Sequence, residues 1–184
     1  MLNPGIRLLA GMRMPQKMLL IAVIFMLPIA YLLFVYERNL TAQIEFASLE
    51  VDGARQVEPA RRIIQSMQLH RGLSQLALAG NADARAKLVE VKDRIGAGFD
   101  DLGKVTADLD ERLKSREAAT GLRNDWQSLA ARSEGLSAAE SFREHTAAIE
   151  RLQDFILLTA DRSNMTLDPD LETFYLVDAF ATKI

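Results

Sequence analysis

The hydrophobic and polar positions divide this chain into one uninterrupted apolar run and a long segment in which apolar residues recur at helical intervals. The run covers residues 18–36 and contains no charged side chain. An uncharged run of this length is typical of a membrane-spanning helix, because about 20 residues rising about 1.5 Å each cross the hydrocarbon core of a bilayer. We therefore predict a transmembrane helix over residues 18–36, preceded by a short tail over residues 1–17.

Two other interpretations of the run fit the sequence less well. A secretory signal peptide has a shorter apolar core and a cleavage site between small residues, whereas residues 36–40 offer no pair of small residues. A buried core helix of a small domain keeps a polar face, and this run is apolar on every side. Pro28 lies in the middle of the run, and proline is tolerated in transmembrane helices.

The charges on either side of the run predict its orientation. The tail contains Arg7, Arg13 and Lys17 and no acidic residue, so the positive-inside rule places the N-terminus in the cytoplasm. The 25 acidic residues of the chain all follow the run, together with 19 of its 22 basic residues. We expect an inner (cytoplasmic) membrane protein whose residues 37–184 are periplasmic or extracellular, and the acidic exterior argues against nucleic-acid binding.

The segment after the run is predicted to be all-α. No proline occurs between Pro59 and Pro169, and no alternating β-branched run interrupts the helical spacing. The expected helices cover residues 37–79, with a kink or a new start at Pro59, and then 82–113, 116–133 and 138–167. Together they predict that the transmembrane helix continues into an antiparallel, up-down four-helix bundle over residues 37–167.

Two breaks in the pattern help to set helix boundaries. Ser137 and Glu140 have the spacing of a capping box, which predicts a helix start at residue 138. Pro169 begins a further helix over residues 168–184, and the sequence ends within its pattern. We expect the chain to be the N-terminal part of a longer, C-terminally truncated receptor-like protein.

Polar residues at otherwise apolar helix positions are the candidates for a binding site. Arg71 lies four residues after Met67 and seven before Leu78, and His145 lies between Phe142 and Ile149. If the helices turn near residues 80 and 136, both positions lie about nine residues from a turn and share one level of the bundle. A buried arginine needs a partner, and a carboxylate or oxyanion would suit its guanidinium group.

Other residues extend this candidate site along the bundle, and each also has a structural interpretation. The candidate ligand-binding residues are Arg71, His145, Arg62, Thr159, Ser163 and Asn164. For Arg71 an ion pair with an acid of a neighbouring helix, such as Glu90, is favoured over a ligand contact, and an exposed guanidinium group is the third alternative. His145 also suits a hydrogen-bonded histidine at a helix interface, and the hydroxyls of Thr159 and Ser163 suit bonds to their own helix backbone. Asn164 also fits a helix end.

Two segments resemble the helical sensor regions of bacterial transmembrane receptors. The first is Leu69-His70-Arg71-Gly72-Leu73-Ser74, and the second covers residues 161–170 with Tyr175 after it. Such regions occur in methyl-accepting chemotaxis proteins and in some membrane-bound histidine kinases and diguanylate cyclases. Their layout is similar to that of nitrate-sensing and helical bimodular domains, which implies an all-helical sensor that binds small anions or carboxylates.

Composition limits the chemistry of the chain. It has no cysteine and only two histidines, His70 and His145, which are far apart in sequence for a metal motif. No nucleophile elbow or phosphate-binding loop occurs, so we expect no enzymatic activity, cofactor or metal in this chain. The favoured function is a homodimeric chemoreceptor-type sensor of a small anionic ligand, and the alternatives are the sensor of a kinase or cyclase or a membrane-anchored scaffold without a ligand.

Overall fold

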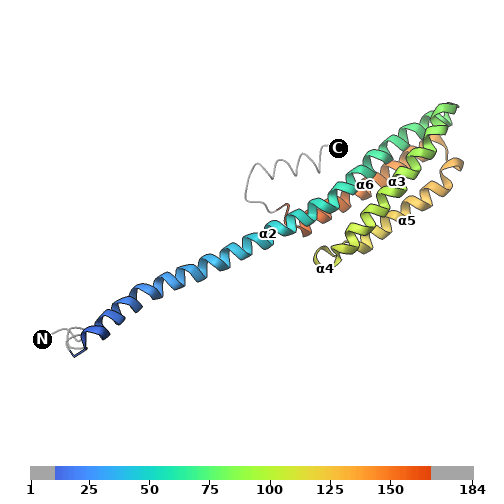
Figure 1. Cartoon of the computed structure of the whole chain (residues 1–184). Coiled ribbons are helices and arrows are strands. Elements are labelled where there is room, and N and C mark those ends of the chain that lie inside the picture. Colours follow the sequence, from blue (N-terminus) through green and yellow to red (C-terminus); the bar gives the residue numbers. More distant parts are fainter. Residues whose placement is uncertain (1–10, 167–184) are drawn as a thin grey trace. The chain divides into compact units, whose positions relative to one another are not determined.

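The computed structural model describes residues 11–166. Its regular elements are all helices, which confirms the all-α part of the predicted fold class. The elements are α2 (Met14–Leu78), α3 (Ala82–Asp108), α4 (Asp110–Leu113), α5 (Arg116–Arg132), the 3-10 turn η1 (Ser133–Gly135) and α6 (Ala138–Arg162) (Figure 1). The chain divides into two units, Met1–Phe46 and Ala47–Ile184. The predicted helix over residues 168–184 lies outside the described residues.

Helix α2 contains both the apolar run and the first amphipathic segment of the chain. By length and composition it is the one helix of residues 11–166 that can cross a membrane, and none of its most apolar window is buried within the protein. The helix continues through Pro28 and Pro59, so of the two alternatives for Pro59, a kink or a new helix start, the new start is wrong. A proline removes one helical hydrogen bond, and burial of the adjacent Ala60 and Ile63 offsets that loss.

The hydrophobic core lies in the second unit and draws on four helices. Its buried members are Ala60, Ile63, Ile64 and Met67 of α2, Val91, Ile95, Phe99 and Leu102 of α3, Ala119, Trp126, Leu129 and Ala130 of α5, and Ala148, Ile149, Leu152, Phe155 and Ile156 of α6. These positions recur every three or four residues within each helix, so each helix presents one face to the core.

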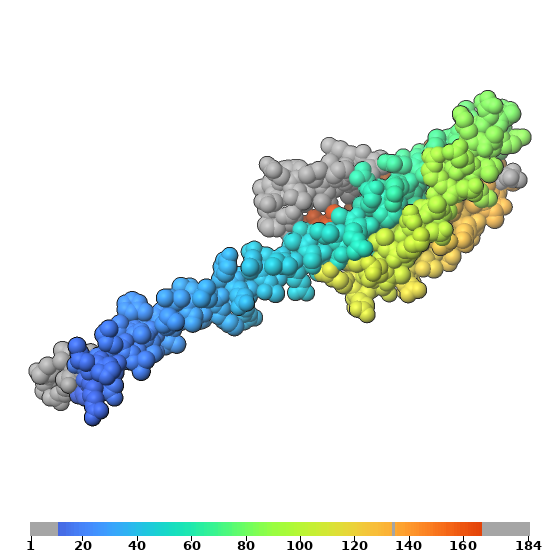
Figure 2. Space-filling model, viewed as in Figure 1, coloured from blue at the N-terminus to red at the C-terminus, as the bar shows by residue number. Residues whose placement is uncertain are grey.

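Contacts between side chains show how neighbouring helices run. Arg55 of α2 forms an ion pair with Asp108 at the end of α3 at 3.1 Å, while a short turn joins the other ends of these helices. Arg151 of α6 likewise pairs with Asp125 of α5. Both pairs of helices therefore run antiparallel, and α3 and α5 lie side by side on the surface (Figure 2).

Two helix boundaries follow from local sequence, and one prediction fails. The side chain of Asn81 accepts a hydrogen bond from the Ala84 amide at 3.0 Å and caps α3. The capping box at Ser137 is confirmed, because its hydroxyl accepts from the Glu140 amide at 3.3 Å and its own amide donates to the Glu140 carboxylate at 3.0 Å. The helix expected over residues 82–113 is wrong as one element, since Leu109 separates α3 from α4.

Two glycines of α3 should affect stability in opposite directions when they are replaced by alanine. A Cβ at Gly98 would lie 2.7 Å from Cγ1 of the buried Ile63, whereas Gly96 and Gly103 have nothing within 4 Å. We expect Gly103→Ala to raise the free energy of unfolding by ~1 kcal/mol through helix propensity. Gly98→Ala should instead lower it by ~1 kcal/mol, because the crowding outweighs that gain. Urea denaturation of the full chain in detergent measures both changes, and equal effects would contradict the close contact.

Candidate functional site

A buried histidine pair is the most unusual polar feature of the core. His70 of α2 and His145 of α6 are 4% and 0% exposed, and Nδ1 of His70 lies 2.8 Å from Nε2 of His145. The two rings are stacked, with centroids 5.0 Å apart and planes inclined by 25°. The pair therefore links α2 and α6, the first and last of the described helices, inside the protein.

The hydrogen bonds assign a proton position to each ring. Nδ1 of His145 lies 2.7 Å from the carbonyl oxygen of Ser141. A carbonyl can only accept, so this nitrogen carries the hydrogen and Nε2 of the neutral ring is an acceptor. Nδ1 of His70 is then the donor to His145. The Ser74 hydroxyl donates to the backbone carbonyl of His70 at 2.8 Å. Its oxygen lies 3.4 Å from Nδ1 of His70 and is a second, longer acceptor for that N–H.

Burial keeps both rings neutral. Burial, and after it the charges of His145 and Lys92, lowers the pKa of His70 from 6.5 to about 4. Burial is also the largest cause of the lowered pKa of His145, although the hydrogen bond to the Ser141 carbonyl opposes it. At neutral pH the pair therefore consists of two uncharged imidazoles, in agreement with the hydrogen-bond directions.

Trp126 of α5 packs against the histidine pair from the side. Its ring meets that of His70 edge to face, with centroids 5.1 Å apart and planes at 88°, and its centroid lies 6.4 Å from that of His145. Perpendicular ring contacts of this kind are favourable because the positive edge of one ring faces the negative face of another. The three rings join α2, α5 and α6 in one cluster.

The histidine pair does not belong to a larger group of metal-ligating side chains among residues 11–166. Within the described part of the chain, no group of three or more histidine, cysteine or carboxylate side chains is placed to ligate one. His70 and His145 already use their facing nitrogens in a mutual hydrogen bond. The chemistry available to the pair is therefore proton binding and hydrogen bonding.

Arg71 lies beside this cluster, at the surface between α2 and α6. Its Nη1 donates to the hydroxyl of Thr146 at 2.9 Å, and its guanidinium carbon lies 4.7 Å from the centroid of the Phe142 ring. Glu90, the expected acidic partner, instead pairs with Arg94 of its own helix at 2.8 Å. The ion pair expected between Arg71 and Glu90 is therefore wrong.

The remaining predicted ligand residues do not converge on one place. Arg62 is exposed and pairs with Glu58 at 3.8 Å. Thr159 lies 14 residues beyond His145, which separates them by about 21 Å along α6. Its hydroxyl donates to the Phe155 carbonyl at 2.9 Å, which agrees with the alternative of backbone bonding. One small ligand cannot touch all of these residues.

The last two predicted residues are explained by the end of α6. The Ser163 hydroxyl is buried and donates to the Ala160 carbonyl at 3.3 Å. Asn164 has a left-handed backbone with φ of 61°, a conformation that asparagine tolerates better than most residues. Its structural interpretation as a helix-end residue is supported.

Sequence reasoning missed His70 and Trp126. Separation along the chain was the argument against joining the two histidines, yet the structure places their nitrogens 2.8 Å apart. One feature of the sequence could have predicted this contact: residues 71 and 145 are expected at the same height in the bundle, and His70 directly precedes Arg71. No family model matches this chain, and neither curated proteins nor solved structures yielded a match.

Proposed function

We propose that this chain is the membrane anchor and extracytoplasmic sensor region of a chemoreceptor-type signal-transducing receptor for a small anionic ligand. In this proposal the N-terminus is cytoplasmic, residues 18–36 cross the inner membrane, and residues 37–184 are periplasmic or extracellular. The sensor is an up-down four-helix bundle made by the second part of α2 with α3, α5 and α6. Chemotaxis is the favoured output, and a histidine kinase or diguanylate cyclase is the alternative.

One observation carries the proposal. Helix α2 contains both the exposed apolar run and His70, which bonds to α6 in the core. A change in packing at that contact acts on the same helix that is long and apolar enough to enter a membrane. Packed helix interfaces switch between discrete arrangements rather than deforming continuously, and a ligand favours the arrangement to which it binds more tightly.

An exposed face of α2 supports a homodimer. Val51, Leu69 and Leu76 are 60%, 46% and 52% exposed, and the last two are seven residues apart with Arg62 seven before them. Positions seven residues apart share one side of a helix that packs against another helix. A second copy anchored in the same membrane would present the same face in parallel orientation.

Disulfide cross-linking of the full chain in membranes tests this proposal. Because the chain has no cysteine, Val51→Cys introduces a single thiol on the exposed face of α2. Val89→Cys on α3 is the matched control, since Val89 is 64% exposed. Oxidation should give a dimer with Val51→Cys only, and nitrate or a small carboxylate should change the rate of cross-linking.

The possible results separate the proposed classes. A rate that changes with an anion supports a receptor. Cross-linking that no anion in the set changes favours the scaffold without a ligand. Equal cross-linking at Val51 and Val89, or none at either, contradicts the dimer along α2.

A further inference from the structure

The interface between α2 and α6 changes character along its length. The apolar core draws on residues 60–67 of α2 and 148–156 of α6. Beyond that core, toward the turn after α2, the buried residues of the two helices are His70, Ser74 and Ala77 on α2 and Ser141 and His145 on α6. We call these five residues the polar end of the interface. All of them are small or polar, so the polar end gains little from apolar burial and depends on hydrogen bonds.

Three hydrogen bonds between described residues join α2 to α6 around the polar end. One is the bond between the two imidazoles at 2.8 Å. Nη1 of Arg71 donates to the hydroxyl of Thr146 at 2.9 Å, and the side-chain amide of Gln75 donates to the carbonyl of Ala138 at 2.9 Å. The imidazole bond is the one of these three that is fully buried. Water can replace the partners in the other two, so the imidazole pair controls how well this end is satisfied.

The packed imidazole pair has room for one added proton and not for two. One hydrogen lies between Nδ1 of His70 and Nε2 of His145, and Nδ1 of His145 donates to the Ser141 carbonyl. Nε2 of His70 is the ring nitrogen left to accept a proton. With both rings protonated, two N–H groups would face each other at 2.8 Å, and neither would have an acceptor there. Separated helices let each ring bind a proton, so acid favours separation.

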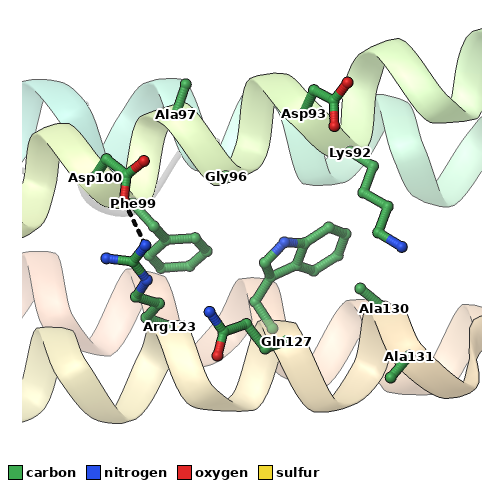
Figure 3. A pocket seen from close by; sticks show the side chains of 11 residues that line it. Lys92, Asp93, Gly96, Ala97, Phe99, Asp100, Arg123, Gln127, Ala130 and Ala131 are labelled. Carbon is green, nitrogen blue, oxygen red and sulfur yellow. Dashed lines mark hydrogen bonds and ion pairs between the residues drawn. The ribbon is translucent and has the colours of Figure 1, made fainter.

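Most charged groups around the pair oppose even the first proton. Burial and, after the second ring, the charge of Lys92 on α3 lower the pKa of the α2 imidazole. The ammonium of Lys92 extends from α3 toward α5, whereas the carboxylate of Asp93 points away from α5 (Figure 3). Arg71 of α2 opposes a proton on the α6 imidazole and Glu144 of α6 favours one, but burial has the larger effect on its pKa. Glu144 also pairs with Arg132 of α5 at 2.7 Å.

We propose that the polar end is a proton-binding site that makes this protein sense acid: protons taken up by His70 and His145 separate α2 from α6 there while the apolar core stays packed. Regions with few buried apolar contacts open at a lower free energy than the core, which confines the change to the polar end. Helix α2 also contains the apolar run. The role of protons as a stimulus therefore rests on the proposed receptor function, whereas the proton site itself does not.

Thiol labelling of the full chain in detergent micelles tests the proton site. The chain has no cysteine, so Ser74→Cys places a single thiol at the polar end. Thr159→Cys is the matched control, because residues 74 and 159 are both buried, at 6% and 0% exposed, and residue 159 lies far from the polar end on α6. Dithiodipyridine reacts with thiols in acid, and each labelling rate is divided by that of the same variant unfolded in guanidinium chloride at the same pH.

The labelling ratios should differ in size, pH dependence and urea dependence. From pH 6 to pH 5 the ratio for Ser74→Cys should rise about 50-fold, because each imidazole released from the packed pair contributes about sevenfold. At pH 5 it should exceed the ratio for Thr159→Cys by at least about tenfold. Dilute urea should raise the ratio for Thr159→Cys and leave that for Ser74→Cys nearly unchanged, because local separation exposes little surface.

His70→Gln and His145→Gln test the number of protons. Each variant leaves one imidazole, so the rise in the Ser74→Cys ratio from pH 6 to pH 5 should fall from about 50-fold to about sevenfold. Circular dichroism at pH 7 checks that both variants keep the helix content of the parent. The comparison of Ser74→Cys with Thr159→Cys needs neither variant, so a substitution that prevents folding leaves the test intact.

The results also distinguish the proton site from the receptor proposal. A Ser74→Cys ratio that does not depend on pH, or that equals the Thr159→Cys ratio at pH 5, overturns the proton site. If nitrate or a small carboxylate still changes cross-linking at Val51→Cys, the receptor proposal survives that failure. Acid is a stimulus if His70→Gln changes the cross-linking rate at pH 5 and not at pH 7. If labelling follows the expectation but neither acid nor an anion changes cross-linking, the proton site stands and the receptor proposal fails.

Discussion

Acidification from pH 7 to pH 5 should lower the free energy of unfolding by about 2 kcal/mol through His70 alone. Its pKa is 6.5 when unfolded and about 4 in the folded protein. The unfolded chain therefore binds a proton more readily as the pH falls below 6.5, and stability is lost until the pH reaches about 4. The lowered pKa of His145 acts in the same direction.

Burial sets the sign of both pKa shifts, and most of the charges around the pair act in the same direction. Lys92 of α3 disfavours a proton on His70, and Arg71 of α2 disfavours one on His145. Glu144 favours protonation of His145, but burial has the larger effect. A proton on either ring therefore stays unfavourable while the helices remain packed, because Glu144 offsets only part of the loss of solvation at His145.

Urea denaturation at pH 7, 6 and 5, followed by Trp126 fluorescence, measures this loss. His70→Gln is the matched variant, because its amide can still donate to His145 but does not titrate. It should remove the part of the pH dependence between 7 and 5 that His70 contributes and leave the part that comes from His145. Ordinary carboxylates hardly titrate in this range. A wild-type stability that is flat over this range would contradict a neutral buried pair.

The sequence could predict the helices because their periodicity and end signals are local. The capping box at Ser137 specifies the start of α6 with residues three apart, and the structure has the same start. The interruption at Leu109 could not be predicted in this way. It depends on burial of Leu109 and Leu113, which are 5% and 1% exposed, and burial is set by neighbours distant in sequence.

The candidate site was harder to predict because a seven-residue repeat does not match a straight helix. The repeat continues from Ile64 through Arg71 to Leu78. Ile64 is buried, but beyond Met67 the buried positions of α2 are 70, 74 and 77. An ideal helix drifts by ~20° per heptad relative to that repeat. The drift turns Arg71 toward the surface and His70 into the core, so the choice between adjacent residues required the structure.

Gly53→Ala should lower the free energy of unfolding by about 3 kcal/mol, the upper end of the usual cost of overpacking. A Cβ at Gly53 would lie 2.1 Å from Oγ and 2.4 Å from Cβ of Ser163, where α2 approaches the end of α6. Ser163 is fully buried, so neither helix can yield without separating. This contact with Gly53 also gives a structural role to Ser163, which the sequence analysis proposed as a ligand-binding residue.

Removing the opposing side chain provides the control for this prediction. Ser163→Gly deletes the two nearest of the three atoms that the new Cβ would meet, and the third, Sδ of Met165 at 2.9 Å, belongs to a flexible side chain that can move. The double variant Gly53→Ala/Ser163→Gly should therefore recover most of the stability lost in Gly53→Ala. Interaction energies between contacting residues of about 0.5–3 kcal/mol are measurable by such a double-mutant cycle. Additive effects of the two substitutions in urea denaturation would mean that α2 and α6 do not meet at Gly53. If the cycle shows coupling, the side chain of Ser163 packs against Gly53 where α2 meets α6. A Ser163 variant that no longer responds to an anion would then have lost this packing contact and not a ligand contact.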